Sequence, residues 1–192
     1  MAQVRYLSHP QVIIDPNVPV PDWGLNDVGA ARVAALAGAP ALAHTVAVYA
    51  STETKATETG APLAAAIPCP LLTRNTMGEN DRSATGFLPG PEFEAVADQF
   101  FAHPAESIRG WERAVDAQAR IVAAVEAALA EAPPGDILLV GHGGVGTLLW
   151  CHLAGEPIRR LRDQPPGGGN WYAFDRESRA LDGAWAPMER LL

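Results

Sequence analysis

The stretch that decides the fold is DILLVGHGGVGTLL, residues 136–149. It opens with the strand-like run DILLV at 136–140, which is apolar from Ile137 on, and this is typical of a strand that is covered on both faces of a sheet. A glycine-rich turn, GHGG, follows at once and leads into an apolar segment with helical character. A strand that runs through such a turn into a helix indicates an α/β fold with a largely parallel sheet, in which the turn lies at the carboxyl end of a strand.

Apolar runs and helix-period segments alternate along the rest of the chain. Strands are predicted over 4–8, 45–50 and 67–72, and helices over 27–36, 52–66, 91–101 and 110–131. Asn26 is the expected cap of the first helix. Prolines at 68 and 70 suggest that the third strand lies at a sheet edge or ends there. The pattern predicts a three-layer α/β/α sandwich with a mostly parallel central sheet.

Residues 73–91 break this alternation, because Gly, Asn, Asp, Pro and Ser dominate there. A loop of this length inside a compact domain is usually functional or disordered, so we expect a cap or an insertion around 73–110. The chain has 192 residues, of which 48% are hydrophobic, which is enough for one core but hardly for two. We therefore expect a single domain over residues 1–192.

Composition excludes several classes of protein. The formal net charge of -8 argues against nucleic-acid and membrane-surface binding, which both need a cationic face. The 2 cysteines lie far apart without metal-ligand spacing, so we expect neither a disulfide framework nor a metal, and we expect no other cofactor. No apolar stretch approaches the roughly 18 residues of a membrane span, and the N-terminus does not resemble a signal peptide. A cytoplasmic location is the expectation, and the oligomeric state stays open.

The GHGG turn around His142 admits several interpretations. As a dinucleotide-binding turn it would need an acidic residue about 20 positions later at the end of a second strand, and Asp163 has no predicted strand before it. A serine hydrolase would need a serine where His142 stands. Two alternatives stay open, namely a functional imidazole at the rim where open α/β sheets bind ligands, and a histidine that only packs within the turn.

Another histidine follows the first predicted strand, in the motif Ser8-His9-Pro10. Parallel strands that pair bring their carboxyl ends to one rim, so His9 and His142 are expected to meet. An early strand-end histidine together with a late GHGG turn resembles the histidine phosphatase superfamily, which has the phosphoglycerate mutase-like fold. In that family a strand runs into Arg-His-Gly, the histidine becomes transiently phosphorylated, and a second histidine contacts the same phosphoryl group. The resemblance implies that His9 is the nucleophile and that His142 and Gly143 contact the phosphoryl group.

The stretch YASTETKATETGAPLA at 49–64 is similar to the second strand of the family and its Ser-x-x-x-Arg-Ala-x-x-Thr-Ala helix. The family's first arginine is replaced by Ser8, its glycine by Pro10 and its second arginine by Lys55. Arginine grips phosphate with a planar fork, whereas lysine is a flexible point charge and serine offers a neutral hydroxyl. The loss of one ionic donor costs on the order of 10² to 10³ in rate, so these replacements would weaken the phosphate clamp.

The loop GENDRSATG at 78–86 supplies further candidates, because in the family the acid that protonates the leaving oxygen often comes from this region. We favour Glu79 as this general acid and take Asp81 as the second choice, since a carboxyl beside a phosphate is favoured in its protonated form. Arg82 could donate to phosphate in place of a missing arginine. The alternative is that all three side chains form a solvated charged loop.

Two function classes follow from these residues. The first is a phosphatase-type hydrolase that acts on a phosphate monoester through a phosphohistidine at His9. In it, Ser8, Lys55 and Arg82 bind the phosphate together with Gly143, and the partner is a small phosphorylated molecule. The second is a family member with impaired catalysis that binds a phosphate anion or another metabolite. A mutase is the weakest enzyme option, because a diphosphorylated intermediate needs more positive charge than the sequence shows.

Overall fold

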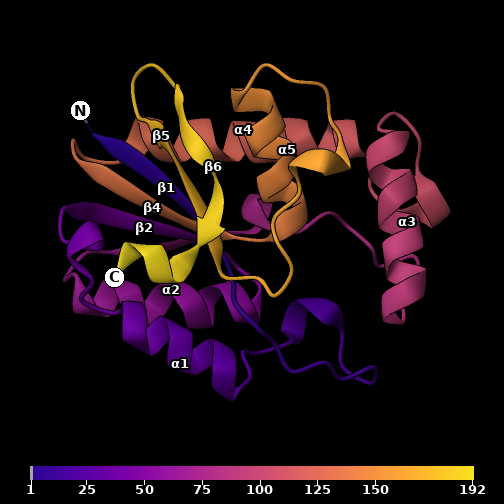
Figure 1. The fold of residues 1–192 in the computed structure, drawn as a ribbon, viewed down its shortest axis with the longest axis horizontal. Coiled ribbons are helices and arrows are strands. Elements are labelled where there is room, and N and C mark those ends of the chain that lie inside the picture. Colours follow the sequence, from indigo (N-terminus) through magenta and orange to yellow (C-terminus); the bar gives the residue numbers. More distant parts are fainter. Residues whose placement is uncertain (1) are drawn as a thin grey trace.

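The structure is a computed structural model that describes residues 2–192. In this part of the chain, six strands form one sheet in the order β3-β2-β4-β1-β5-β6 (Figure 1). The strands are β1 (Gln3–Ser8), β2 (Thr45–Ser51), β3 (Leu71–Arg74), β4 (Asp136–Gly141), β5 (Asn170–Asp175) and β6 (Leu181–Pro187). The neighbours β3, β2, β4 and β1 are parallel, whereas β5 and β6 are antiparallel to their neighbours. The predicted α/β architecture with a mostly parallel sheet is confirmed.

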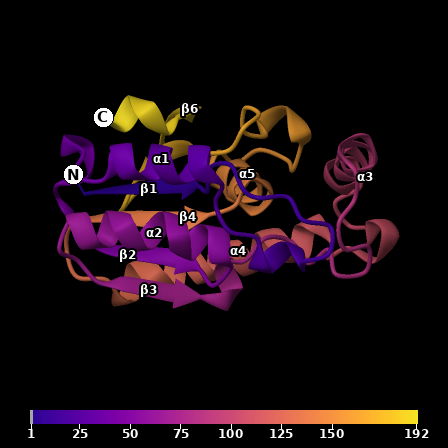
Figure 2. The ribbon, with the colours of Figure 1, turned by 90° about the horizontal axis from the view of Figure 1, so that it is seen from below.

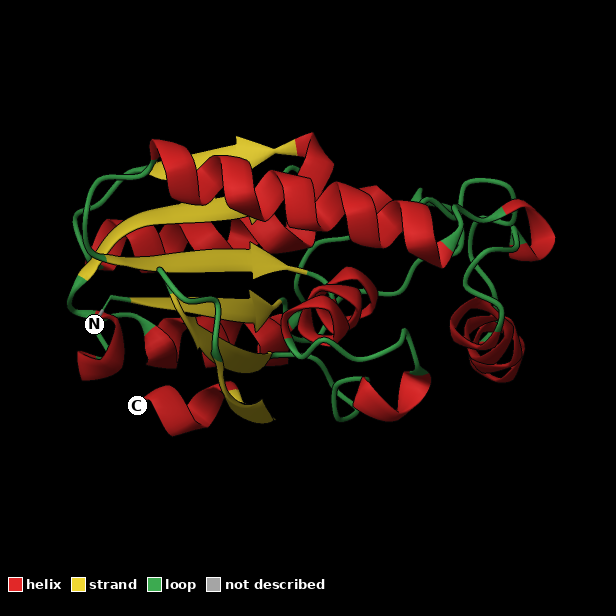
Figure 3. Ribbon diagram, turned by 90° about the horizontal axis from the view of Figure 1, so that it is seen from above, coloured by secondary structure: helices red, strands yellow, loops and turns green. Residues whose placement is uncertain are grey.

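Helices cover both faces of the sheet. They are α1 (Asp27–Leu36), α2 (Thr54–Ala66), α3 (Gly90–Ala102), α4 (Ala114–Glu131) and α5 (Gly143–Leu153). Figures 1 and 2 show α1 and α2 on one face and α4 and α5 on the other. The helix α3 stands at one end, beyond the carboxyl ends of the parallel strands (Figure 3). Within residues 2–192, none of the helices is long and apolar enough to cross a membrane.

The central strand β4 shows why two layers of helices are needed. Its side chains alternate between the faces, so that Ile137 and Leu139 pack into the core under α4 and α5, whereas Leu138 and Val140 pack into the core with α1 and α2. All four side chains are completely buried. The continuous apolar run in the sequence therefore reflects burial on both faces of the sheet.

The first helix begins as predicted, because the Asn26 side-chain oxygen accepts a hydrogen bond from the Gly29 N–H at 2.9 Å. The third strand was predicted at 67–72 but begins only at Leu71, since Pro68 and Pro70 have no N–H to donate to a ladder. It does lie at a sheet edge. The long helix α4 begins at 114 rather than at 110, because a short 3-10 turn and extended backbone at Trp111 precede it.

Candidate active site

The two histidines lie side by side at the carboxyl ends of β1 and β4. Ser8 pairs with Gly141 in the parallel register, and the next residue, His9, donates its N–H to the Gly141 carbonyl at 2.9 Å. The ring centroids of His9 and His142 are 5.3 Å apart and the rings meet edge to face. Strand pairing therefore brings together residues that are far apart in the sequence.

The imidazole of His9 is held in one tautomer by the residue that follows it. Its Nδ1 lies 2.8 Å from the carbonyl oxygen of Pro10, which can only accept, so Nδ1 carries the proton and Nε2 keeps a free lone pair. Burial, with a smaller effect of the neighbouring His142, lowers the pKa of His9 from 6.5 to about 3. A neutral ring with a free lone pair is the form that a nucleophile requires.

His142 is completely buried, and its backbone is held by a tyrosine of β1. The Tyr6 hydroxyl donates to the His142 carbonyl at 3.0 Å and accepts from the His142 N–H at 3.1 Å. Neither ring nitrogen of His142 makes a hydrogen bond to any group in residues 2–192. Burial lowers the pKa of this histidine. Because unsatisfied buried nitrogens are costly, this ring is a strong candidate for a ligand contact.

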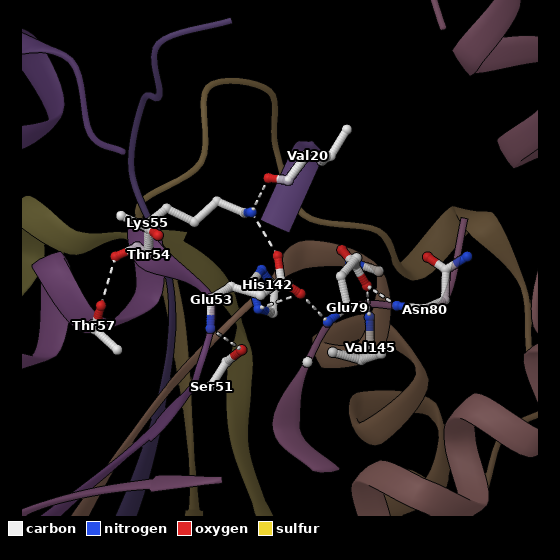
Figure 4. Close-up of polar contacts among 12 residues, drawn as sticks. Val20, Ser51, Glu53, Thr54, Lys55, Thr57, Glu79, Asn80, His142 and Val145 are labelled. Carbon is white, nitrogen blue, oxygen red and sulfur yellow. Dashed lines mark hydrogen bonds and ion pairs between the residues drawn. The ribbon is translucent and has the colours of Figure 1, made fainter. Parts of the chain in front are cut away.

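The carboxylate of Glu53 lies against Lys55 and His142, two of the predicted phosphate contacts (Figure 4). Its Oε2 accepts from the Lys55 ammonium at 2.5 Å, and its Oε1 accepts from the Glu79 N–H at 2.9 Å and lies 3.4 Å from His142 Nε2. Lys55 is buried and also donates to the Val20 carbonyl at 2.7 Å. Burial raises the pKa of Glu53, but the charges of His142 and Lys55 outweigh it and lower this pKa to about 2. Lys55 therefore already has a counterion within the protein.

Glu79 is bound to the first turn of α5. Its carboxylate accepts from the N–H groups of Gly144 at 3.0 Å and Val145 at 2.9 Å, and from its neighbour Asn80 at 3.1 Å. Helix N-termini favour negative charge. Burial raises the pKa of Glu79, but the charge of His142 contributes to a net lowering. In the free protein Glu79 is therefore an ionised carboxylate that can accept a proton.

Ser8 is buried and binds the segment that leads into β5. Its hydroxyl donates to Gln164 Oε1 at 2.6 Å and accepts from the Asn170 N–H at 3.0 Å. The Gln164 amide lies against the helix start, where a Cβ at Gly143 would be 2.1 Å from Gln164 Nε2. A Cβ at Gly144 would be 2.7 Å from a carboxylate oxygen of Glu79. A side chain at either glycine would therefore have to displace one of these polar groups.

A cavity of about 340 Å³ opens beside His9. Its polar lining includes His9, Glu79, Arg82, Arg160, Asp163 and Gln164. The Arg82 guanidinium lies over the rings of Phe93 and Trp111, at 5.1 and 5.6 Å from their centroids. Arg82 is therefore held in the cavity wall by cation–π contacts with these two rings.

Two further carboxylates differ in their access to this cavity. Asp163 lines it and accepts from the Thr147 hydroxyl at 3.0 Å, and burial raises its pKa. Asp81 is exposed, accepts from the Ser83 N–H at 2.8 Å and lines an adjoining cavity instead.

Within residues 2–192, no three His, Cys, Asp or Glu side chains are grouped to hold a metal ion.

Three polar residues of the site escaped sequence reasoning. Glu53 stands only two positions before Lys55, and a search for the counterion of a buried lysine would have found it. The position of Asp163 in the sequence suggested only a test of the dinucleotide-binding pattern, which it does not meet. Gln164 left no signal, because its 2.6 Å contact with Ser8 joins residues that are 156 positions apart.

Comparisons with known proteins place the chain in a family. The model of the histidine phosphatase superfamily (branch 1) matches residues 18–182, so the match begins after the Ser8-His9-Pro10 motif. No curated protein matches the chain. A mycobacterial glucosyl-3-phosphoglycerate phosphatase, solved with inorganic phosphate, is 20% identical with a TM-score of 0.80 over 98% of this chain and 99% of that one.

Two other solved structures agree with this result. The same mycobacterial phosphatase in complex with VO3 is 20% identical, with a TM-score of 0.75 over 91% of this chain and 93% of that one. YhfR of Bacillus stearothermophilus is 21% identical, with a TM-score of 0.76 over 95% of either chain. At these identities the likeness shows the fold alone. Because the family model spans most of the residues, this chain belongs to the histidine phosphatase superfamily and has its phosphoglycerate mutase-like fold.

Proposed function

We propose that this protein is a phosphatase that hydrolyses a phosphate monoester through a phosphohistidine at His9. The observation that carries the proposal is the tautomer of His9, whose Nδ1 donates to the Pro10 carbonyl at 2.8 Å and leaves the Nε2 lone pair free beside a cavity. A phosphatase of the same fold binds inorganic phosphate, which supports a phosphoryl group as the ligand. The ring of His142, with its unsatisfied nitrogens, is the proposed second contact.

The proposed reaction has two displacements at phosphorus. First, His9 Nε2 attacks, the N–P bond forms, the ester P–O bond breaks and the leaving oxygen takes a proton from a carboxylic acid. Water then attacks phosphorus, the N–P bond breaks and the carboxylate takes the proton of the water. Inorganic phosphate and the free histidine are the products.

Glu79 is our first choice for the acid, because it lines the cavity and lies against the helix that His142 opens. Its pKa is lowered in the free protein, and a phosphoryl group placed beside it would favour the protonated form. Asp163 becomes the second choice, because it lines the same cavity and its pKa is already raised by burial. Asp81 is less well placed, since it faces the adjoining cavity.

A second candidate function is the binding of an anion or a metabolite without turnover. Glu53 favours it, because this carboxylate engages Lys55 and lies against His142, the two expected phosphate contacts. Ser8 adds only a neutral hydroxyl where the family has an arginine. A clamp with so little free positive charge could hold a ligand and still stabilise a transition state poorly.

A search for the phosphoenzyme separates the two candidates. The protein is mixed with p-nitrophenyl phosphate and denatured in alkali, in which the N–P bond of phosphohistidine persists. We expect a phosphorylated peptide that contains His9 in the parent protein and none in His9→Ala. The matched control is His103→Ala, which alters an exposed histidine after α3 and should retain the label.

Each outcome is informative. A phosphoenzyme in His9→Ala would overturn the assignment of the nucleophile. Binding of inorganic phosphate without turnover of any phosphate ester would favour the binding protein. Glu79 would be supported as the acid if Glu79→Gln loses turnover at both acidic and alkaline pH while Asp163→Asn keeps the turnover of the parent protein.

A further inference from the structure

The replacement of an arginine by Ser8 leaves a question about what holds the phosphoryl oxygens. Ser8 is completely buried, and its hydroxyl is already engaged with Gln164 and Asn170. It therefore has no free donor for a ligand. A donor that substitutes for the arginine must come from another residue beside His9.

Gln164 lies in that position. It lines the cavity together with His9 and Gly143. The segment that carries it is anchored to the nucleophile, because the Gly169 N–H donates to the His9 carbonyl at 2.9 Å. Its Nε2 is the atom closest to the position of a Cβ on Gly143, at the start of α5. The amide nitrogen thus lies at the turn that carries His142.

The orientation of this amide is determined by a chain of hydrogen bonds. The Asn170 Nδ2 donates to the Pro165 carbonyl at 2.9 Å, and a carbonyl accepts only from a donor, so the nitrogen of Asn170 is identified. The same Nδ2 donates to the Gln164 side chain at 3.2 Å, so the atom that it meets is the oxygen. Ser8 donates to that oxygen as well, at 2.6 Å. Gln164 Nε2 therefore faces away from both residues and makes no hydrogen bond within residues 2–192.

We propose that the side-chain amide of Gln164 is a donor to a phosphoryl oxygen in this site and takes the place of the arginine that is missing at position 8. This inference rests on the proposed function, because it assumes that the anion beside His9 is a phosphoryl group. Ser8 and Asn170 act as positioning residues, since they hold the amide oxygen and so aim its nitrogen. The donor is neutral, and neutral hydrogen bonds are roughly half as strong as charge-assisted ones. The site consequently holds phosphate by aimed hydrogen bonds more than by net positive charge.

Gln164→Glu is the most direct test. The substitution keeps the side-chain shape and the acceptor for Ser8 and Asn170, but it replaces the amide nitrogen with an anionic oxygen that repels phosphate. We expect kcat/KM for p-nitrophenyl phosphate to fall about 100-fold, as for the loss of an oxyanion donor. The dissociation constant of inorganic phosphate, measured by calorimetry, should rise by at least about 10-fold, the equivalent of one hydrogen bond.

Two further variants separate the loss of the donor from the effect of the added charge. Gln99→Glu makes the same change on the exposed side of α3 and should leave both constants within about 2-fold, since surface changes have small effects. Gln164→Met removes the donor without adding charge and should raise the phosphate dissociation constant by about 10-fold. If either Gln164 variant fails to fold, NMR of the parent protein still decides the point. The Gln164 side-chain amide resonances should shift when inorganic phosphate is added.

The results distinguish this inference from the proposed function. Weaker phosphate binding in Gln164→Glu supports the inference even if no ester is hydrolysed, and only the phosphatase function would then fail. Turnover in the parent with unchanged KM, kcat and phosphate affinity in both Gln164 variants overturns the inference and leaves the phosphatase intact. A parent protein that binds no inorganic phosphate, or whose Gln164 resonances do not shift on binding, also overturns it.

Discussion

The Glu53→Gln substitution tests whether an internal carboxylate competes with phosphate for the site. It preserves the length and shape of the side chain and removes its charge. The charged group that it removes accepts from Lys55 at 2.5 Å and lies 3.4 Å from His142 Nε2. Two opposite effects follow, one on the stability of the fold and one on the affinity for phosphate.

Stability should decrease, because Lys55 loses its counterion. The Lys55 side chain is only 4% exposed in the ion pair. Removing one partner of a buried ion pair lowers the free energy of unfolding by about 3 to 5 kcal/mol. The Val20 carbonyl remains as an acceptor at 2.7 Å, so we expect the lower end of this range, about 3 kcal/mol.

Phosphate affinity should increase. A phosphoryl oxygen that accepts from His142 Nε2 must approach the position of the Glu53 carboxylate. Two like unit charges about 4 Å apart repel by about 4 kcal/mol near a protein surface and by about 1 kcal/mol in water. The Glu53 side chain is 13% exposed, so water still reaches it, and we take a repulsion energy between these two values. We therefore expect a gain of about 2 kcal/mol, or about 30-fold in the phosphate dissociation constant.

The assay combines urea unfolding, with and without inorganic phosphate, and calorimetric measurement of phosphate binding. Phosphate should stabilise Glu53→Gln more than the parent, because stabilisation grows with the ratio of ligand concentration to dissociation constant. Glu177→Gln is the matched control, since it removes the same charge from an exposed turn. Equal phosphate affinity in Glu53→Gln and the parent would refute the competition. An unchanged free energy of unfolding would refute the buried ion pair.

Three other predictions concern the histidines and their supports. The His9 ring should stay neutral through the range in which a model histidine titrates, which NMR can follow. The pKa of His9 is 6.5 in the unfolded chain and about 3 in the folded protein, so the free energy of unfolding should fall as the pH falls between these values. His9→Gln should weaken this pH dependence. Gly144→Ala would place a Cβ 2.7 Å from the Glu79 carboxylate and should lower the free energy of unfolding by about 1 to 3 kcal/mol, whereas an unchanged urea midpoint would contradict the close approach. Tyr6→Phe removes the acceptor of the buried His142 N–H, whereas the His142 carbonyl still accepts from the Gly146 N–H at 3.1 Å. The unpaired N–H should cost about 1 to 3 kcal/mol in the same measurement, and a smaller loss would mean that water replaces the hydroxyl.

The elements that sequence reasoning predicted well are those in which the signal is local. The run at 137–140 predicted a buried strand because all four of its side chains are apolar. The glycines of GHGG predicted a junction between strand and helix, and β4 does pass into α5 there across the single residue His142. The cap at Asn26 follows from one side chain and the N–H three residues later. The third strand was predicted to begin at 67, but it begins at Leu71. The apolar character of 67–70 suggested a strand, although Pro68 and Pro70 have no N–H to donate to the hydrogen-bond ladder. The role of residues 73–110 as a cap stays a prediction.

By itself, the sequence indicated the α/β architecture, because burial patterns are encoded in short apolar runs. It also predicted that His9 and His142 meet, because parallel strands that pair share a rim, whereas the strand order came from the structure. Only the tertiary structure decided what surrounds these histidines. The Pro10 carbonyl sets the tautomer of His9, the Glu53 carboxylate neutralises Lys55, and a distant amide, that of Gln164, is aimed beside them. Such contacts depend on rotamers and loop paths that join residues up to 156 positions apart. No local pattern carries that information, because hydrogen-bond partners across a fold are chosen by geometry and by the cost of leaving buried polar groups unpaired.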